Sequence, residues 1–505
     1  MAVHPCTARS LLKNYVFQQA ASFARRTWAL ALMLIMSGAS VSAEPVTHHY
    51  TVHVDYLMSR LWVEARFSHP VDSVAARSRD AGKFLLDVRS CADDQQIRMR
   101  NRRMMLPEHG ISCMNYTVDL ERAAKEHRYE KMLAPENIIV SPSYWMWRPE
   151  IRNGTSIQIE FRLPENVQVS VPWKQIGTND STYLLSKSPE SAYAPVIFGE
   201  FDYREVDVPG ATLRVSLLTG IDEMDNDSIV RWINATANDV SLTYGRFPNP
   251  SPQVIVIPVG NGRGNSRSAV PFGRVIRDGG VTVELQVDQS QPLEALLSDW
   301  TATHEFSHLM LPYVDRKHRW ISEGFAQYYQ NVLLTRSGAY NELYAWQKIH
   351  DGYERGRQSR PELSPNGATG GGVRSGLMKV YWSGAAIALM ADVRIRENSG
   401  GNESLDDVLD KFQACCLPSD RVWSGPELFE KFDKLVSTPV FMSLYRRYAD
   451  TAGFPDTSHV FERLGLAVTD GKVRIRRSAE LQAIRDAILE TDTAAANARD
   501  QLASN

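Results

Sequence analysis

From Thr47 to about Phe201 the chain alternates hydrophobic and polar positions in short runs, which is the pattern of β-strands. The runs YTVHVDYLM, KFLLDVRS, SIQIEFRL and VQVSVPW concentrate β-branched and aromatic residues, and Pro, Gly, Asn and Asp separate them. No long segment with a 3.6-residue period follows Val140 in this part of the chain. The pattern predicts a β-rich N-terminal domain of sandwich type over residues 44–205.

Beyond Asp225 the pattern changes, and helix-like and strand-like segments follow one another. DSIVRWINATANDVSLTYG has apolar residues at helical spacing, with Asp225 or Asp227 as a candidate N-cap and Gly245 as the stop. QVIVIPVG and GGVTVELQVD predict two buried strands. The intervening NGRGNSRSAVPFGR is rich in Gly and Arg and predicts a flexible surface loop. No Lys-Ser/Thr follows its GNGRG, which argues against a phosphate-binding loop.

Two further helices are predicted in the middle of the chain. PLEALLSDWTATHEFSHLML reads as one helix, which Pro292 opens and Pro312 ends. ISEGFAQYYQNVLLTRSG reads as a second helix with Ser322 as its N-cap. After the glycine-rich SPNGATGGGVRSG the chain is mainly helical, although its last dozen residues lack apolar positions and predict a frayed end. The elements predict an α+β fold with a mixed domain over residues 206–360 and a helical C-terminal domain over residues 361–505.

The N-terminus has the features of an export signal. Arg25 and Arg26 precede the apolar run WALALMLIM, and the small residues VSA stand at positions 41–43. This order predicts a signal peptide over residues 1–43. A transmembrane anchor is the alternative, but the apolar run is only about half of the roughly 20 residues that span a bilayer. We expect cleavage after Ala43, a periplasmic or secreted mature chain, and no stable membrane insertion after cleavage.

Composition narrows the class of protein. A chain of 505 residues exceeds what one compact core usually holds, so two or three domains are expected. The 43% apolar and 23% charged content is ordinary for a globular protein. The formal net charge of -3 gives no electrostatic reason to expect a nucleic-acid partner. The sequence does not predict the oligomeric state.

Four cysteines follow the signal peptide, an even number that permits disulfides in an exported chain. Cys91 and Cys113 form the obvious pair, with two free buried thiols as an equal alternative. Pairing of Cys415 with Cys416 is also open. None of the four has CxxC spacing, which argues against a cysteine-ligated zinc site.

The strongest chemical signal is HEFSH at residues 304–308, within the predicted helix. Two histidines four residues apart lie on one face of a helix, where both imidazoles reach a single ion. Glu305 projects about 100° round the helix. It therefore lies beside the ion, in the position of a general base for a zinc-bound water. Because the chain has 12 histidines, a chance match is the competing interpretation.

A catalytic zinc keeps three protein ligands and one open position. Six residues past His308 stands Val314, which excludes the metzincin arrangement with a third histidine there. Glu323 is the alternative, because an antiparallel helix pair brings the start of the second helix opposite the histidines. A first-turn acid that compensates the helix dipole is the competing explanation for it. His318 is a weaker candidate ligand, since its charged loop favours exposure to solvent.

HExxH followed by W-x-x-E-G-x-A-x-Y resembles the gluzincin metallopeptidases of the peptidase MA clan, the group that contains thermolysin, aminopeptidase N and glycyl aminopeptidase. The matching residues are His304, Glu305, His308, Trp320, Glu323, Gly324, Ala326 and Tyr328. The resemblance implies one zinc ion held by His304, His308 and Glu323, with Glu305 as the catalytic base. It also implies that residues 206–360 form a thermolysin-like catalytic domain. The 14 residues between His308 and Glu323 are a shorter spacer than is typical of thermolysin and aminopeptidase N, which weakens inference about specificity.

A second resemblance lies downstream. In relatives of aminopeptidase N, a helix after the zinc helices carries Tyr-x-x-Gly, and the tyrosine hydroxyl stabilises the oxyanion. VYWSGAAIALMADV places Tyr381 three residues before Gly384, within the predicted C-terminal domain. The resemblance implies that Tyr381 is a catalytic hydrogen-bond donor, and a buried core tyrosine is the competing interpretation. The likeness covers the chain from about Val281 to Val393.

Together these residues predict a zinc-dependent metallopeptidase, a hydrolase that acts on peptide or protein substrates. A catalytically inactive, peptidase-like binding or scaffold protein of the cell envelope is the alternative, although Glu305 and all three ligands are retained. A zinc hydrolase that acts on other bonds is not excluded. Aminopeptidase activity is favoured only weakly: relatives hold the substrate's α-ammonium group with an acid from a G-x-M-E-N strand. Here Glu284 lacks that context, and an exposed strand residue is the competing interpretation.

Overall fold

The computed structural model describes residues 46–504, apart from residues 101–102, 127–132, 178–180, 190–193, 221–224, 261–267 and 371–375. The predicted signal peptide, residues 1–43, lies outside the described residues. Val46–Asn505 forms one compact unit by itself. Among the described residues, no helix combines the length and the apolar character that crossing a membrane requires. The domain boundaries near residues 205 and 360 stay predictions.

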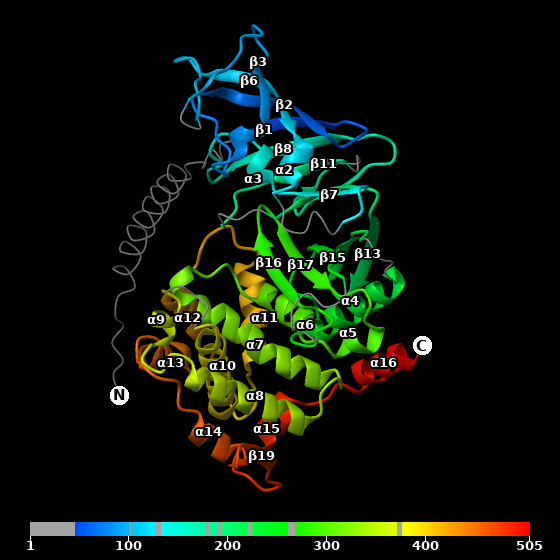
Figure 1. The fold of residues 1–505 in the computed structure, drawn as a ribbon. Helices are drawn as coiled ribbons and strands as arrows, with labels where there is room; N and C mark the ends of the chain where they lie inside the picture. The colour runs from blue at the N-terminus through cyan, green and yellow to red at the C-terminus, as the bar shows by residue number, and fades with distance from the viewer. Residues whose placement is uncertain are drawn as a thin grey trace, which may run out of the picture. The chain divides into compact units, whose positions relative to one another are not determined.

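The N-terminal part is rich in β-structure, as its alternating pattern predicts (Figure 1). Seven strands form one sheet, in the order β10 (Lys174–Gln175), β11 (Thr182–Leu185), β8 (Thr155–Arg162), β1 (Val46–Val54), β2 (Arg60–Val71), β6 (Ile111–Asp119) and β3 (Leu85–Ser90). Three strands form a smaller sheet, in the order β7 (Asn137–Val140), β12 (Val196–Gly199) and β9 (Gln168–Ser170). Both sheets contribute to one hydrophobic cluster that includes Tyr50, Phe161, Trp173 and Phe198.

Short elements complete this part of the chain. They are η1 (Ala81–Lys83), β4 (Met99–Arg100), β5 (Arg103–Met104), α2 (Leu120–Ala124) and α3 (Pro142–Trp145). The side chains of Asp119 and Ser141 cap α2 and α3 by accepting backbone N–H groups of the first turn. These caps satisfy donors that a helix start otherwise leaves without a partner.

A five-stranded sheet follows, in the order β13 (Asp202–Val208), β14 (Ala211–Leu217), β15 (Gln253–Pro258), β17 (Val281–Val287) and β16 (Phe272–Arg277). The strands β14, β15 and β17 run parallel, while β16 pairs antiparallel with β17 and forms an edge of the sheet (Figure 1). Helix α4 (Asn226–Ser241), which Asp225 caps, packs with Val254, Val256 and Val283 in the main hydrophobic cluster. The connection through Arg277–Val281 contains Gly279 at φ 68°.

The edge strand corrects the prediction of a loop over NGRGNSRSAVPFGR. Residues 261–267 of that segment lie outside the described residues, but Phe272 begins a strand that pairs with β17 from Phe272↔Gln286 to Arg277↔Val281. Asp-Gly between alternating segments is a strong hairpin signal, and Asp278–Gly279 follows the strand directly. The glycine and arginine content of the preceding residues obscured this signal.

A buried polar seam joins the three-stranded sheet to the central sheet. Ser216 Oγ donates to Ser170 Oγ at 2.7 Å, and Gln253 Nε2 donates to the same oxygen at 2.8 Å. Thr282 Oγ1 donates to Gln253 Oε1 at 2.6 Å. Because buried polar groups are costly when unpaired, this seam specifies how the two sheets meet.

The predicted helix over PLEALLSDWTATHEFSHLML is two helices in the structure. They are α5 (Leu293–Ser298) and α6 (Thr301–Ser307), and the 3-10 turn η3 (His308–Met310) continues α6. Asp299 is extended at ψ 137° and interrupts the helix. Its carboxylate accepts hydrogen bonds from the Thr301 and Val270 N–H groups. These side-chain hydrogen bonds replace helical backbone hydrogen bonds that are lost at the break.

The C-terminal part is mainly helical, as predicted (Figure 1). Its elements are η4 (Arg316–His318), α7 (Arg319–Arg336), α8 (Glu342–Gln358), α9 (Pro365–Ala368), α10 (Leu377–Asn398), α11 (Leu405–Cys416), α12 (Gly425–Asp433), α13 (Phe441–Tyr448), α14 (Ser458–Arg463), β18 (Leu466–Thr469), β19 (Lys472–Ile475), α15 (Gln482–Ile488) and α16 (Thr493–Ser504). The predicted frayed end is wrong, because α16 is anchored: buried Arg499 pairs with Asp239 and donates to the Leu297 carbonyl oxygen.

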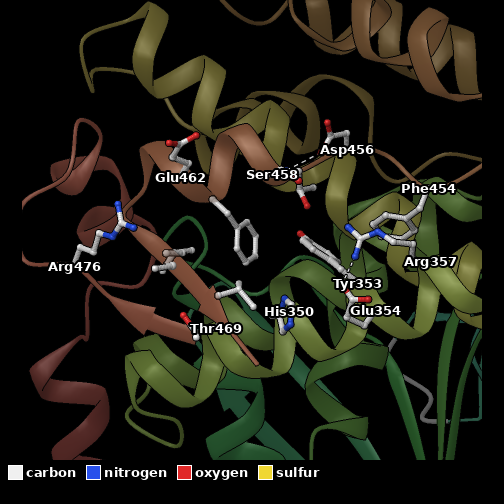
Figure 2. A pocket seen from close by; sticks show the side chains of 15 residues that line it. His350, Tyr353, Glu354, Arg357, Phe454, Asp456, Ser458, Glu462, Thr469 and Arg476 are labelled. Atoms are coloured by element: carbon white, nitrogen blue, oxygen red, sulfur yellow. Dashed lines mark hydrogen bonds and ion pairs between the residues drawn. The ribbon is translucent and has the colours of Figure 1, made fainter. Parts of the chain in front are cut away.

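A cavity of about 640 Å³ lies between α8, α14 and the β18–β19 hairpin (Figure 2). Tyr353 and Phe454 lie at its wall, and the Arg357 guanidinium covers the Phe454 ring at 5.2 Å. The cavity shares no lining residue with the site described below. Within the described part of the chain, no group of metal-ligating side chains occurs there.

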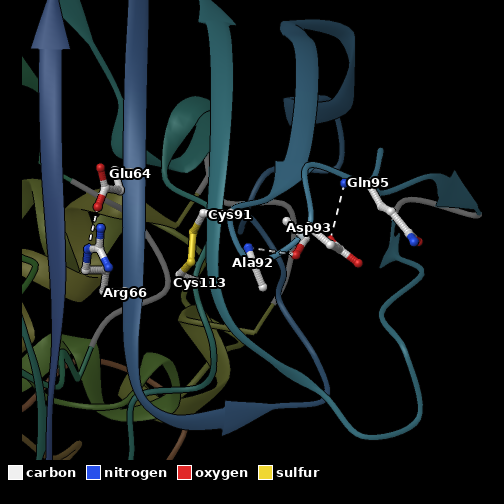
Figure 3. The surroundings of a disulfide bond; sticks show 8 residues. Glu64, Arg66, Cys91, Ala92, Asp93, Gln95 and Cys113 are labelled. Atoms are coloured by element: carbon white, nitrogen blue, oxygen red, sulfur yellow. Dashed lines mark hydrogen bonds and ion pairs between the residues drawn. A yellow bond between two sulfur atoms is a disulfide. The ribbon is translucent and has the colours of Figure 1, made fainter.

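Both pairs of cysteines are disulfide-bonded. Cys91 follows β3 and bonds to Cys113 of β6, with their Cα atoms 5.6 Å apart (Figure 3). The disulfide therefore links the two ends of the segment that runs from β3 to β6. The adjacent Cys415 and Cys416 bond at the end of α11. The alternative of free buried thiols therefore does not hold for Cys91 and Cys113.

Candidate metal centre

Two helices bring the candidate ligands together. α6 carries His304 and Glu305, His308 follows at the start of η3, and α7 carries Glu323. The rings of His304 and His308 lie 4.8 Å apart between centroids, one helical turn from each other. Helical periodicity alone produces this pairing, whereas Glu323 joins it only because α7 packs against α6.

The three side chains form a compact, buried donor group. Glu323 Oε2 lies 3.5 Å from His304 Nε2 and 3.4 Å from His308 Nε2. The ligand atoms of all three residues lie within 4.8 Å of one another, and this is the single such group found in the described residues. Two imidazole nitrogens and one carboxylate oxygen are a donor set that catalytic zinc sites use.

Outer contacts orient each of these side chains. His304 Nδ1 is 3.1 Å from Gln330 Oε1, an acceptor, so Nδ1 carries the proton and Nε2 is left to face Glu323. His308 Nδ1 lies 3.0 Å from Ser322 Oγ. Arg319 Nε donates to Glu323 Oε1 at 2.8 Å, which leaves Oε2 for the histidine side. Such partners fix ring orientation and tautomer at metal sites, so the residues present fit a zinc ion.

Charge keeps Glu323 ionised despite its burial. Burial by itself raises the pKa of this carboxyl, but His308, His304 and Arg319 together lower the pKa well below its usual value. For His304, burial lowers the pKa, and the contacts with Glu323 and Glu305 outweigh it and raise the pKa. A buried, ionised carboxylate is stable only when it is paired or coordinates a metal, and a divalent cation bound here would neutralise its charge.

Glu305 lies beside this group but is not a member of it. Its side chain is buried against β16: a Cβ on Gly273 would meet Glu305 Cγ at 2.5 Å. Glycine at 273 therefore allows the strand to approach the helix closely enough to enclose the carboxylate. Burial raises the pKa of Glu305, and His308 and His304 partly offset that rise. A buried carboxyl with a raised pKa suits proton transfer near neutral pH.

Two glycines bring Tyr381 to the same place. A Cβ on Gly324 of α7 would lie 2.2 Å from Gly384 Cα of α10, and a Cβ on Gly384 would lie 1.9 Å from the Trp320 carbonyl oxygen. The helices therefore cross in near backbone contact, and Tyr381 lies one turn before the crossing. Its ring stacks on His304 at 5.7 Å between centroids. Burial, then the Glu323 charge, raises the pKa of Tyr381, so its hydroxyl stays a neutral donor.

The structure corrects three local details of the predicted site. α7 begins at Arg319, so Glu323 lies in the second turn rather than the first and does not serve the helix dipole. Ser322 is not an N-cap, because it lies inside α7, which begins at Arg319, and its hydroxyl contacts His308 instead. His318 does not face solvent: it is 6% exposed, and its ring contacts Asp315 and Tyr445 rather than the ligand group.

Glu284 is buried, which contradicts one of the two roles predicted for it. It is 0% exposed in β17, so it is not an exposed strand residue. Its Oε2 accepts from Arg274 Nη2 at 2.6 Å across the β16–β17 pair. Arg274 lines the cleft beside the ligand group, whereas Glu284 does not. The acid on which the aminopeptidase expectation depended is therefore buried and does not line the cleft.

The ligand group opens into a cleft of about 490 Å³ between β16, the turn before α7 and the start of α10. Glu305, His308, Glu323 and Tyr381 all line it. A volume of this order is within the usual range for sites that bind small ligands.

One comparison with known proteins bears on the architecture. No family model matches the sequence, and no curated protein matches it either. Among solved structures, an aminopeptidase N family protein from Idiomarina loihiensis aligns with a TM-score of 0.61 and 13% identity, over 84% of this chain and 79% of that chain. The chain has an aminopeptidase N-like fold. The M1 zinc metallopeptidase from Deinococcus radiodurans aligns with a TM-score of 0.48 and 14% identity, over 82% of this chain and 94% of that one.

Four residues of the site escaped the sequence interpretation. Arg319 had a readable signal, since it stands four residues before Glu323 on the same helix face. Gln330 stands seven residues after Glu323, two turns along that face. A glutamine in a helix does not by itself indicate a contact with a ligand, so its role could not be predicted. Ser322 resembled a cap, and Gly273 resembled part of a loop. Only the packing of α6, α7 and β16 distinguishes these roles.

Proposed function

We propose that this chain is a zinc-dependent metallopeptidase that hydrolyses peptide bonds of peptide or protein substrates. The observation that carries the proposal is the buried group of His304, His308 and Glu323, with Glu305 beside it in a cleft. The aminopeptidase N-like fold supports it. One zinc ion per chain is expected.

Each cleft residue has a chemical task in this proposal. When bound, zinc supplies Lewis-acid chemistry that polarises a carbonyl and makes water more acidic. Glu305 accepts the proton of the attacking water and passes it to the leaving nitrogen. Tyr381 donates a hydrogen bond to the carbonyl oxygen as that oxygen gains negative charge. Arg319 holds the outer oxygen of Glu323 and so fixes which oxygen faces the histidines.

Aminopeptidase specificity has weaker support. It requires an acid that holds the α-ammonium group, and Glu284 is paired with Arg274 outside the cleft. The proposal is therefore peptide-bond hydrolysis. Aminopeptidase action, the finer form, is a narrower proposal that is tested separately. Release of the N-terminal residue of the substrate would support the finer form, and internal cleavage or release of the C-terminal residue would contradict it.

Elemental analysis combined with hydrolysis of a mixed peptide library tests the function. We expect about one zinc per chain, peptide cleavage that a chelator abolishes, and recovery on adding zinc. Bound zinc without cleavage of any peptide would favour the inactive binding or scaffold protein. Absence of zinc from the purified and zinc-treated protein would contradict the proposal itself.

A ligand variant should separate Glu323 from its competitor. Glu323→Ala removes an ionised donor and leaves the Arg319 charge unpaired, so we expect zinc to be lost or held far more weakly. The measurement is zinc per chain after dialysis. His318→Ala is the matched control and should retain zinc, because its ring contacts Asp315 and Tyr445 instead. Normal zinc in Glu323→Ala with loss in His318→Ala would reverse the assignment.

We also propose that the chain is exported through its N-terminal segment. A basic stretch, an apolar run and VSA at residues 41–43 support cleavage after Ala43. N-terminal sequencing of protein recovered outside the cytoplasm should begin at Glu44. Recovery of the uncleaved chain in a membrane fraction would indicate an anchor instead.

A further inference from the structure

The cleft beside the ligand group carries more positive than negative charge. Among the described residues that line it, four are arginines and two are carboxylates. The arginines are Arg274 and Arg277 of β16, Arg316 of η4 and Arg319 of α7. Both carboxylates, Glu305 and Glu323, already have tasks in the proposed chemistry. A substrate that enters the cleft therefore meets positive charge that the lining residues do not balance.

Two of the arginines already bind acceptor groups of the protein around the site. Arg319 bonds to the Glu323 carboxylate and belongs to the machinery of the ligand group. Arg277 donates to the backbone carbonyl oxygens of His308 and Leu311 at 3.0 and 3.2 Å. These contacts orient both guanidinium groups toward protein acceptors, so neither is the first choice for binding a substrate.

Arg316 is in a different position. It is exposed in the short turn η4, and its guanidinium has no hydrogen-bond or ion-pair partner within the part of the chain that the structure describes. The carboxylate of its neighbour Asp315 is taken by the His318 ring at 2.8 Å. A guanidinium at a cleft wall with unused donors is a ready site for a planar anion.

Arg274, in the edge strand β16, also belongs to the lining of the cleft. Its pairing with Glu284 uses Nε and one Nη group, yet 40% of its side chain is still exposed. Because Glu284 is fully buried, it holds Arg274 in place without itself meeting a substrate. Among the described residues, Arg274 and Arg316 are thus the two lining arginines that are not bound to the ligand group or to its backbone.

We propose that the cleft selects peptides that carry a carboxylate close to the scissile bond, and that Arg316 binds this carboxylate together with the exposed edge of Arg274. The inference rests on the proposed peptidase function and names its substrate class. Planar, bidentate guanidinium–carboxylate contacts supply the recognition. An Asp or Glu side chain and a free C-terminal carboxylate share this chemistry, and the experiment distinguishes them.

Two matched series of peptides test the preference on the full-length mature protein with zinc. In the first, one Glu is moved along an otherwise neutral peptide, and each peptide is compared with its Gln counterpart. In the second, neutral peptides carry either a free C-terminal carboxylate or an amide. We expect at least one series to show a kcat/KM about tenfold higher for the carboxylate member, mainly through KM. Raising the salt concentration should reduce the ratio. Equal rates within both series would overturn the proposal.

Single-residue variants test whether Arg316 causes the preference for a carboxylate. Arg316→Gln should reduce the carboxylate-to-amide ratio about tenfold while leaving the neutral peptides within about twofold. Lys317→Gln is the matched control, because Lys317 is an exposed cation of the same turn that does not line the cleft. A single change at Arg274 would leave Glu284 buried and unpaired, so the second variant is the neutral pair Arg274→Gln with Glu284→Gln. An unchanged ratio in Arg316→Gln, or an equal loss in Lys317→Gln, would overturn the assignment.

A binding measurement separates failure of this inference from failure of the proposed function. The zinc-loaded Glu305→Gln protein is titrated with the best Glu peptide and its Gln counterpart, with and without Arg316→Gln. Tighter binding of the Glu peptide that depends on Arg316 supports carboxylate recognition even where no peptide is cleaved. Cleavage of all peptides at similar rates, with equal binding, supports the peptidase and contradicts the inference.

Discussion

Glu305→Gln should leave zinc bound and reduce kcat by at least about 10²-fold. Glutamine keeps the size and much of the hydrogen bonding of the side chain beside Gly273 but cannot take a proton from water. Glu305 is not one of the three donors that converge, so the metal content should stay at the wild-type level. Steady-state kinetics on a peptide from the library, together with elemental analysis, measure both effects.

The control for this variant is Glu294→Gln, which removes one carboxylate from the exposed surface of α5. It should leave both turnover and zinc unchanged. Turnover of Glu305→Gln within a few-fold of wild type would show that another group takes the proton. Loss of zinc in Glu305→Gln would instead place Glu305 among the ligands.

Tyr381→Phe should lower kcat by about 10²–10³-fold with little change in KM, because a donor to the developing oxyanion acts in the transition state. Tyr381 stacks on His304 and lines the cleft, and both features survive in phenylalanine. Zinc content and Tm should therefore stay close to wild type. Kinetics over a range of peptide concentrations separate kcat from KM.

Tyr353→Phe is the matched control, since Tyr353 is a buried tyrosine whose hydroxyl donates to the Ala385 carbonyl oxygen at 3.4 Å. It lies outside the cleft and should retain full turnover. A core tyrosine at 381 would show the same behaviour as this control, with a modest fall in Tm at most. Full activity in Tyr381→Phe would thus remove the catalytic assignment while leaving the ligand group intact.

The sequence by itself determined the local features of this protein. Alternating positions predicted a β-rich N-terminal part, and helical periodicity predicted α4 and a helical C-terminal part. The sequence left the cap of α4 open between Asp225 and Asp227, and the structure shows Asp225. These signals are readable because neighbouring residues in the chain decide them. The four-residue spacing of His304 and His308 is of the same kind, since one turn of helix places both rings together.

Tertiary structure decided which of these residues meet. Glu323 reaches the histidines because α7 packs against α6, and Gln330, Ser322 and Arg319 contact the three ligands only in that packing. Tyr381 reaches the same place because Gly324 and Gly384 let α7 and α10 pack closely. The burial of Glu284 depends on β16, a strand that forms by pairing with β17. Arg499 holds α16 through Asp239, 260 residues away. Burial and pairing between distant segments leave no periodic trace in the sequence, because they depend on how whole elements pack.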